Sequence, residues 1–278
     1  MCPVTAGIAS PVAQRGVFGA RQLFLLACST STWDRISRVR RRFFVEQFTG
    51  NTAAIEGDTA HHLGRVLRAQ QGQLYELSDG QRVRIGRIEK VARDRVDFAL
   101  LEEIPAHPLA IDLTLLLSIV KFDAFEWAIE KATELGVSTI IPLASARSEK
   151  ALLAAAGKRV DRWKKILSEA SQQSRRVRVP VLQSVSQPTQ AFSAHATAAV
   201  KIMLSERTDA PSLRRTLQTE PARQQAVLAI GPEGGWTDAE FAGAQASGFR
   251  EASLGKLILR TETAVVAAIA AINYALAE

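Results

Sequence analysis

A glycine-rich segment lies between a predicted strand and a predicted helix in the last fifth of the chain. It runs from Gly231 to Trp236, follows the apolar stretch Ala226–Ile230, and precedes Thr237–Glu240, the sequence of a helix capping box. Glycines at the carboxyl end of a strand permit positive φ angles and let a ligand approach bare backbone. Ligands of open α/β sheets bind at that edge. The competing interpretation is a turn that needs glycine for its geometry alone.

A second candidate segment runs from Leu254 to Ala264. A predicted strand, Glu251–Leu254, enters a glycine turn, and an apolar stretch then delivers Arg260 and Glu262 to the start of a helix. This helix is apolar nearly all round, so we expect it to be buried, in part at a subunit interface. A charge entering buried structure needs a partner, which favours a functional Arg260. For the threonine and glutamate beside it, helix capping is the alternative.

Two nucleotide-binding motifs are excluded by the spacing of these glycines. The segment Gly231–Trp236 is not G-x-G-x-x-G, the dinucleotide fingerprint. Six residues, not four, separate Gly248 from Gly255, and Leu257 stands where a P-loop has the serine or threonine that holds Mg²⁺. The sequence shows no cluster of metal ligands, and we expect no metal site.

Two basic clusters suggest a polyanionic partner. Residues 158–178 hold eight basic and two acidic side chains, on a predicted helix over Lys158–Ser174 and the segment after it. The stretch Arg82–Arg95 holds six basic residues against Glu89 and Asp94. A solvated surface is the alternative for each, but together two such patches could clamp a phosphate backbone.

The predicted elements divide the chain into two ordered parts after an N-terminal tail. From Arg40 to about Glu103 the pattern is β, with a hairpin signal at Asp79-Gly80 and a short helix over His61–Arg68. A linker, Pro105–Pro108, leads to the second part. There, strands alternate with helices, which predicts a parallel sheet. Its strand candidates are Ile111–Val120, Ser138–Leu143, Val200–Leu204, Ala226–Ile230 and Glu251–Leu254, and Ala124–Leu135 is a helix that stops at Gly136.

Composition fits a globular protein with an unusual N-terminal stretch. Of the 278 residues 47% are hydrophobic, and residues 1–42 account for +6 of the net charge of +7. Both cysteines, Cys2 and Cys28, lie in this stretch, so the rest has neither a disulfide nor a cysteine nucleophile, which fits a cytoplasmic protein. The longest apolar run, Ala264–Ile272, is too short to cross a bilayer. We expect residues 1–39 to be a disordered tail or a mis-assigned start; a lipoprotein signal ending at Cys28 is the weaker alternative.

The chain resembles the RsmE family, the uridine-N3 methyltransferases of small-subunit ribosomal RNA. The resemblance runs in order from about Arg40 to Asn273, and its most specific part is the pair Gly231–Gly235 and Leu254–Ala264. The other segments that carry it are Arg41–Val45, Lys121–Val137, Arg147-Ser148 and Glu169–Arg176.

The resemblance implies an α/β fold with two domains and a cofactor. A small PUA-like β-barrel over residues 40–106 would bind RNA, and a SPOUT domain over residues 109–278 would thread a deep trefoil knot. S-adenosylmethionine (SAM) would sit in that knot between three loops. The family works as a homodimer on a uridine near the 3′ end of 16S rRNA.

The same resemblance, with the chemistry of the residues, assigns candidate site residues. Arg260 would stabilise charge on the uracil ring, and Glu262 would orient Arg260 or take the proton. The cofactor-binding set is Leu204, Ser205, Glu206, Gly231, Pro232, Glu233, Gly234, Gly235, Leu254, Gly255, Ile258, Leu259 and Arg260. The RNA-binding set is Arg42, Arg65, Arg84, Arg87, Arg147, Arg175 and Arg176.

Some positions depart from the family pattern, and two alternative functions stay open. Lys256 stands where proline is usual, Arg175 where glycine is usual, and no acid precedes Arg147. These departures put details of the RNA contacts in doubt and leave the cofactor loops intact. The alternatives are a SPOUT methyltransferase for another RNA position or atom, and a non-catalytic RNA-binding factor in ribosome assembly.

Overall fold

The computed structural model describes residues 41–106, 109–218 and 225–276. The predicted tail over residues 1–39 lies outside the described residues, as does the second half of the predicted linker Pro105–Pro108. Contacts place all the described residues in one compact unit. Within that unit the strands form two sheets, one of five strands and one of six.

The first sheet confirms the β pattern predicted after Arg40. Its strand order is β1-β3-β4-β5-β2, with β1 parallel to β3 and the other pairs antiparallel. At the predicted hairpin Gly80 has a φ of +86°, and the Asp79 carboxylate accepts hydrogen bonds from the amides of Gln81 and Arg82. The elements are β1 (Arg42–Phe44), β2 (Thr52–Glu56), α2 (Gly57–His61), the π-helical turn η1 (His62–Val66), β3 (Leu74–Ser78), β4 (Val83–Val91) and β5 (Arg95–Ile104).

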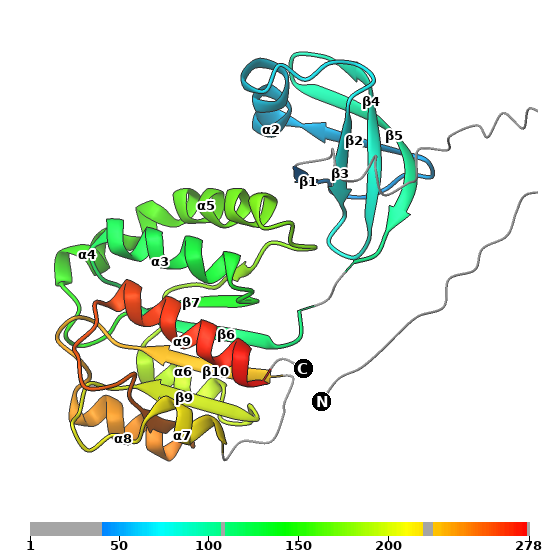
Figure 1. Cartoon of the computed structure of the whole chain (residues 1–278). Coiled ribbons are helices and arrows are strands. Elements are labelled where there is room, and N and C mark those ends of the chain that lie inside the picture. Colours follow the sequence, from blue (N-terminus) through cyan, green and yellow to red (C-terminus); the bar gives the residue numbers. More distant parts are fainter. Residues whose placement is uncertain (1–40, 107–108, 219–224, 277–278) are drawn as a thin grey trace, which may run out of the picture. The chain divides into compact units, whose positions relative to one another are not determined.

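The second sheet is parallel throughout, with the order β11-β9-β10-β6-β7-β8 (Figure 1). Its strands are β6 (Asp112–Ser118), β7 (Thr139–Leu143), β8 (Val181–Leu182), β9 (Val200–Leu204), β10 (Gln225–Ile230) and β11 (Arg250–Ala252). The chain winds from β6 toward β8 and then continues on the other side of β6. That reversal is a topological switch point, where open parallel sheets bind ligands at the carboxyl ends of their strands.

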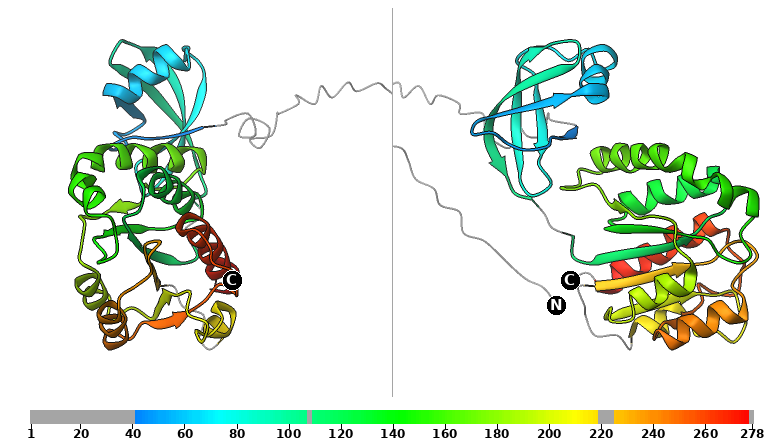
Figure 2. Two further views of the ribbon diagram at one scale, coloured as in Figure 1. Left: turned by 90° about the vertical axis from the view of Figure 1, so that its left-hand side faces the viewer. Right: turned by 180° about the vertical axis from the view of Figure 1, so that it is seen from behind.

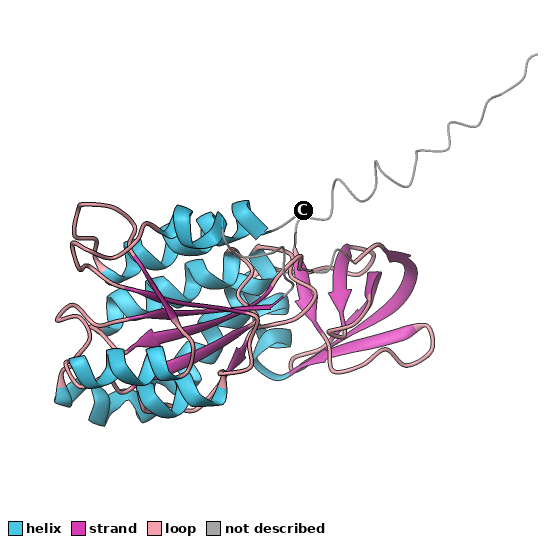
Figure 3. Ribbon diagram, turned by 90° about the horizontal axis from the view of Figure 1, so that it is seen from below, coloured by secondary structure: helices cyan, strands magenta, loops and turns pink. Residues whose placement is uncertain are grey.

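Helices cover both faces of the parallel sheet, as views from behind and from below show (Figures 2 and 3). The helices are α3 (Phe122–Glu134), α4 (Lys150–Ala155), the 3₁₀ turn η2 (Ala156–Arg159), α5 (Val160–Gln173), α6 (Pro188–Ala194), α7 (Leu213–Gln218), α8 (Asp238–Ala246) and α9 (Thr261–Leu276). The helix predicted over Lys158–Ser174 is therefore α5, preceded by a 3₁₀ turn. The end predicted for α3 is confirmed, because Gly136 turns the chain with a φ of +96°.

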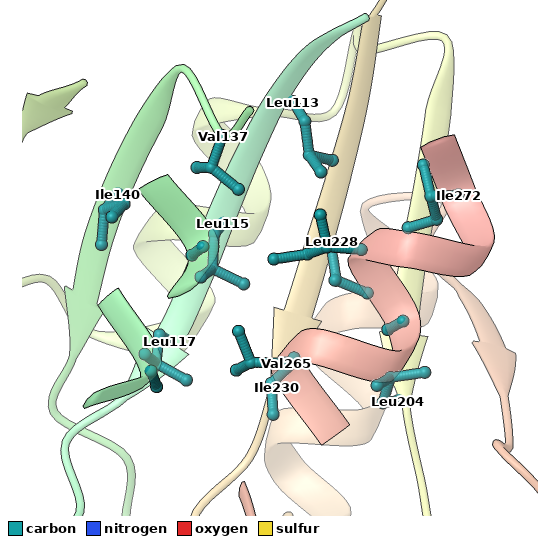
Figure 4. Packing of buried hydrophobic residues seen from close by; sticks show 14 of the residues in the cluster. Leu113, Leu115, Leu117, Val137, Ile140, Leu204, Leu228, Ile230, Val265 and Ile272 are labelled. Carbon is teal, nitrogen blue, oxygen red and sulfur yellow. The ribbon is translucent and has the colours of Figure 1, made fainter. Parts of the chain in front are cut away.

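Alternate residues of the central strands fill two separate cores. On one face Leu113, Leu115 and Leu117 of β6 pack with residues of α3 and α9 (Figure 4). On the other face Leu116 packs with Phe192 of α6 and others. Burying one such side chain contributes roughly 1.5–3 kcal/mol relative to its exposure to water. Burial on both faces explains why the predicted strand Ile111–Val120 is apolar along most of its length.

Candidate active site

The carboxyl ends of β7, β9, β10 and β11 surround a cavity of about 560 Å³. Three loops that follow β9, β10 and β11 supply most of its lining. We call them the first loop (Leu204–Arg207), the second loop (Gly231–Trp236) and the third loop (Ser253–Arg260). The segments that sequence analysis singled out are therefore brought together at one edge of the sheet.

The second loop is held by the helix that follows it. Thr237 and Glu240 form the reciprocal capping box that the sequence predicts at the start of α8. Within the loop Gly235 has a φ of +71°, a left-handed conformation that favours glycine. A Cβ added to Gly231 would lie 3.0 Å from the Trp236 ring, so the indole packs directly on this glycine's backbone.

Trp236 also joins the second loop to the first. Its buried indole Nε1–H donates a hydrogen bond of 2.9 Å to the carbonyl of Leu204. The second loop is joined more weakly to the start of α9, which follows the third loop, by a long hydrogen bond of 3.5 Å from the Thr261 hydroxyl to the Gly231 carbonyl. Sequence analysis did not identify Trp236 as a site residue, since an aromatic side chain beside a glycine turn has no distinctive spacing.

A further wall of the cavity comes from the segment after β7. Arg147 lines the cavity, and its Nη1 donates a hydrogen bond of 2.8 Å to the Gly234 carbonyl. A Cβ on Gly234 would lie 3.2 Å from the Arg147 Cβ, so this glycine allows the close approach. Sequence analysis assigned Arg147 to RNA; the structure places it against the second loop, 87 residues away in the sequence.

The third loop is open to solvent in the single chain. The exposed fractions of Leu257 and Ile258 are 83% and 82%, although both residues line the cavity. Arg260 is exposed as well, and its guanidinium makes no hydrogen bond or ion pair with any residue that the structure describes. The expectation that Arg260 enters buried structure with a partner is therefore wrong for the single chain.

Helix α9 is half-buried, where sequence analysis expects it to be buried nearly all round. Val265, Ala268, Ile269 and Ile272 pack into the core on one side. The opposite side is partly or fully exposed, and Tyr274 has an exposed fraction of 93%. The sequence is apolar on both sides because alanines occupy much of the outer one, and an alanine costs little when it faces water.

The predicted cofactor residues all line the cavity except Gly234, which lies behind Arg147. Glu262, predicted to help catalysis, is not among the lining residues, while Arg260 is. Lining residues that sequence analysis did not assign to the cofactor are Arg147, Arg207, Ile230, Trp236, Asp238, Phe241, Lys256, Leu257, Thr261 and Ala264. Most of these flank the predicted loops, so the lining of the cavity extends beyond the residues predicted from the sequence.

The residues predicted to bind RNA fall into exposed and buried groups. Arg65 and Arg87 are exposed, and Arg84 is half-buried, with hydrogen bonds to the carbonyls of Gly50 and Leu101. Arg42 is buried in an ion pair with Glu76. Arg176 is also buried, and it donates to the carbonyls of Thr133 and Arg178.

Burial changes what these arginines can do. Desolvation, with a smaller effect of the Arg178 charge, lowers the pKa of Arg176 to about 10. Because Arg42 and Arg176 are buried and donate hydrogen bonds to groups inside the chain, we remove both from the set of proposed RNA contacts. Arg175 stays in the set: its side chain is about half exposed, and it adopts a φ of +54° where the family pattern has glycine.

Two kinds of feature are absent from the part of the chain that the structure describes. It contains no group of three or more His, Cys, Asp or Glu side chains arranged to hold a metal ion. Among the same residues, no helix is both long and apolar enough to cross a membrane.

Comparison with known proteins gives consistent matches over most of the chain. A family model described as an RNA methyltransferase domain matches residues 107–273. A ribosomal RNA small subunit methyltransferase E from Synechocystis is 34% identical over 82% of this chain and 75% of its own length. The protein of that name from Bacillus subtilis is 32% identical over 80% of this chain and 90% of its own length.

Solved structures agree with these sequence matches. A ribosomal RNA small subunit methyltransferase E from Neisseria gonorrhoeae, bound to S-adenosyl methionine, has a TM-score of 0.76 and 30% identity, covering 84% of this chain and 97% of its own. A putative methyltransferase from Legionella pneumophila, in complex with bound SAM, has a TM-score of 0.76 and 27% identity, covering 86% and 98%. On these matches, the chain belongs to the ribosomal RNA small subunit methyltransferase E family.

Proposed function

We propose that this chain transfers the methyl group of SAM to N3 of a uridine near the 3′ end of 16S rRNA. One observation carries the proposal: in a member of this family, three loops predicted to bind the cofactor enclose one cavity at the carboxyl edge of a parallel sheet. The relatives named above support it, because two of them were solved with SAM bound.

The cavity fits a cofactor of this size and chemistry. Its volume of about 560 Å³ lies within the range of roughly 300–1,000 Å³ typical of small-molecule sites. Glycine backbone at Gly231, Gly235 and Gly255 would accept the adenine and methionine parts closely, and Leu204 and Leu254 would supply apolar walls. SAM supplies a methyl group already activated on a sulfonium, so the residues of the chain mainly align donor and acceptor.

Arg260 is the residue that we assign to the chemical step. Uridine N3 must lose its proton before it attacks the methyl carbon, and negative charge then spreads onto the flanking carbonyl oxygens. A fixed cation beside those oxygens stabilises the transition state more than the ground state. Arg260 lines the cavity and has no protein partner among the described residues, so its donors are available to the uracil ring.

Glu262 fits a structural role better than proton transfer. It does not line the cavity, and it lies in the first turn of α9, where a carboxylate is stabilised by the helix dipole. Water is then the simplest acceptor of the N3 proton. The target base must be unpaired or flipped out of its helix, because the N3 edge is covered in a base pair.

The finer features of the fold belong to this proposal. The first sheet, over residues 40–106, would be a PUA-like barrel, and residues 109–278 a SPOUT domain whose C-terminal part is threaded into a trefoil knot. A homodimer would cover the exposed side of α9, where Tyr274 lies, and the apolar tip of the third loop at Leu257 and Ile258. Large apolar side chains that are exposed in the single chain, as these three are, fit an interface with a second chain.

RNA binding is electrostatic in this proposal and uses exposed arginines only. We expect Arg65→Glu and Arg87→Glu each to weaken RNA binding and to flatten its salt dependence by about one unit of log-log slope. Arg214→Glu, at an exposed position on α7, is the matched control and should change neither. The measurement is the affinity of each variant for a 16S rRNA fragment over a range of salt concentrations. If the log-log slopes of Arg65→Glu and Arg87→Glu equal that of Arg214→Glu, neither arginine contacts the RNA.

The proposed function is tested by the nucleosides of 16S rRNA from a strain that lacks this gene. We expect mass spectrometry to show the loss of one N3-methyluridine and its return when the gene is restored. Loss of a ribose-methylated or another base-methylated nucleoside would favour a different target atom. An unchanged set of nucleosides, together with defective subunit assembly, would favour a non-catalytic assembly factor.

A further inference from the structure

Glu240 joins two walls of the cavity without lining the cavity itself. We propose that it is a positioning residue: its carboxylate holds Ala146 in place, and Ala146 in turn holds Arg147 against the second loop. This inference rests on the proposed function, because it assigns a residue outside the cofactor site to the affinity of that site. Nothing in a capping box requires such a contact.

The two carboxylate oxygens of Glu240 have different partners. Oε2 accepts a hydrogen bond of 2.8 Å from the Thr237 amide, which with the bond from the Glu240 amide to the Thr237 hydroxyl forms the capping box of α8, and a further one of 2.9 Å from that hydroxyl. Oε1 accepts a hydrogen bond of 2.9 Å from the amide of Ala146, 94 residues away in the sequence. The side chain is buried, so both sets of bonds form away from bulk water.

The segment that Oε1 holds is fixed at three successive residues. The hydroxyl of Ser145 shares a hydrogen bond of 2.6 Å with that of Ser118 at the end of β6, and both are buried. Ala146 donates to Glu240, and Arg147 donates to the Gly234 carbonyl at 2.8 Å. Glu240 thus fixes Ala146, the middle one of these three residues, and the next residue, Arg147, lines the cavity.

Close packing makes the position of Arg147 matter to the second loop. The Arg147 Cβ would lie only 3.2 Å from a Cβ on Gly234, and its guanidinium is near Gly235 as well. A shift of Ala146 therefore moves a side chain that already touches the loop's backbone. Interiors at this density transmit small displacements. We expect this displacement to weaken cofactor binding and not to slow the chemical step, because Arg260, which we assign to that step, lies on the third loop.

Two variants separate positioning from helix capping. Glu240→Gln keeps a residue that capping boxes accept, but its amide NH₂ cannot accept a hydrogen bond, so it cannot serve both partners at once. Thr237→Val removes the capping hydroxyl and leaves the Glu240–Ala146 bond in place. We expect Glu240→Gln to weaken SAM binding by about tenfold with little change in single-turnover rate at saturating SAM. Thr237→Val should lower the unfolding temperature and weaken SAM binding by much less than Glu240→Gln does.

A double-mutant cycle with Arg147 tests the route of the effect. If Glu240 acts through Arg147, Glu240→Gln combined with Arg147→Ala should bind SAM no more weakly than Arg147→Ala alone. Additive losses, or a Glu240→Gln variant with wild-type affinity, would overturn the inference. Should Glu240→Gln fail to fold, Ala146→Pro removes the donor N–H without touching α8, and the same outcomes apply. Failure of the proposed function is a separate result: the wild-type chain itself would not bind SAM in calorimetry.

Discussion

The cavity has two walls of opposite character. The second loop is tied on every side: Trp236 donates to Leu204, Arg147 donates to Gly234, and the capping box of Thr237 and Glu240 fixes its exit. The third loop has few such ties, and its Leu257 and Ile258 are more than four-fifths exposed. The two loops follow β10 and β11, parallel strands that lie on either side of β9 in one sheet, so the difference does not come from the kind of element that carries them.

The difference between the two loops gives them different roles: one binds the cofactor, and the other completes the active site. A wall that is fixed before the ligand arrives does not have to be ordered on binding, which favours affinity. An exposed wall with an unpartnered cation is incomplete in the single chain. We call the second loop the tied wall and the third loop the open wall. We infer that cofactor affinity depends mainly on the tied wall, and that the open wall acts once RNA or a second chain covers it. Each of the following changes affects one wall.

The largest effect is expected at Arg260 on the open wall. Arg260→Ala should keep most of its SAM affinity and lose roughly 10²–10³-fold in single-turnover rate, the loss typical of removing one donor that stabilises a developing oxyanion. Lysine should restore part of the rate, since it offers a point charge instead of a planar fork. Wild-type turnover in Arg260→Ala would end its catalytic assignment, and loss of SAM binding would place it in the cofactor site instead.

The next largest effect is expected at Gly235 on the tied wall. A valine at a φ of +71° is a strained outlier, and its Cβ would lie 2.9 Å from a carboxylate oxygen of Glu206. We expect Gly235→Val to weaken SAM binding by about 100-fold, equivalent to about 2.7 kcal/mol. Gly157→Ala is the matched control, because a Cβ there meets nothing within 4 Å. Equal calorimetric affinities for the two variants would show that the second loop is not the cofactor wall.

A smaller effect is expected from Trp236→Phe. This change keeps an aromatic ring on Gly231 and removes the indole N–H that donates to Leu204. Losing one such bond costs about 1 kcal/mol, so we expect SAM affinity to fall about fivefold. Trp163 lies on α5 and packs against Phe125 of α3, so Trp163→Phe should lower the unfolding temperature and leave SAM affinity unchanged. If both substitutions change stability and neither changes SAM affinity, cofactor binding does not depend on the hydrogen bond from Trp236 to Leu204.

The smallest effect on stability is expected at the tip of the open wall. Replacing Leu257 and Ile258 together by serine should change the free energy of unfolding of the single chain by no more than about 0.5 kcal/mol, because both side chains already face water. The same variant should weaken dimerisation in analytical ultracentrifugation. Leu254→Ser is the control, since Leu254 packs against the core and its loss should destabilise the chain. A marked loss of stability on changing Leu257 and Ile258 would mean that the tip is packed.

Local patterns in the sequence are sufficient to predict much of this architecture. The strand predicted over Val200–Leu204 has these bounds in the structure, and the capping box at Thr237 is formed as predicted. Two of the three loops that line the cavity can be found from the sequence, because a glycine turn after an apolar strand is a short-range signal. The last strand, predicted over Glu251–Leu254, is β11 (Arg250–Ala252), and Leu254 has already left it to line the cavity.

Long-range partners could not be predicted in this way. The contact of Ala146 with Glu240 joins residues that share no spacing rule, and the second oxygen of a capping glutamate looks like any other. Arginine clusters mislead for a related reason: Arg175 and Arg176 are neighbours in the sequence, yet one side chain is about half exposed and the other is buried. Burial is decided by what packs over a residue, and the local sequence does not contain that information.

The most direct test combines wild-type protein, deuterated-methyl SAM and small subunits from a strain that lacks the gene, followed by mass spectrometry of the 16S nucleosides. We predict one labelled N3-methyluridine per subunit with the wild-type chain and, in the same time at a SAM concentration near the wild-type Kd, only a small fraction of that label with Gly235→Val. Label in another nucleoside, or no label although the protein binds SAM and the subunits, would contradict the assignment of this cavity to uridine-N3 methylation.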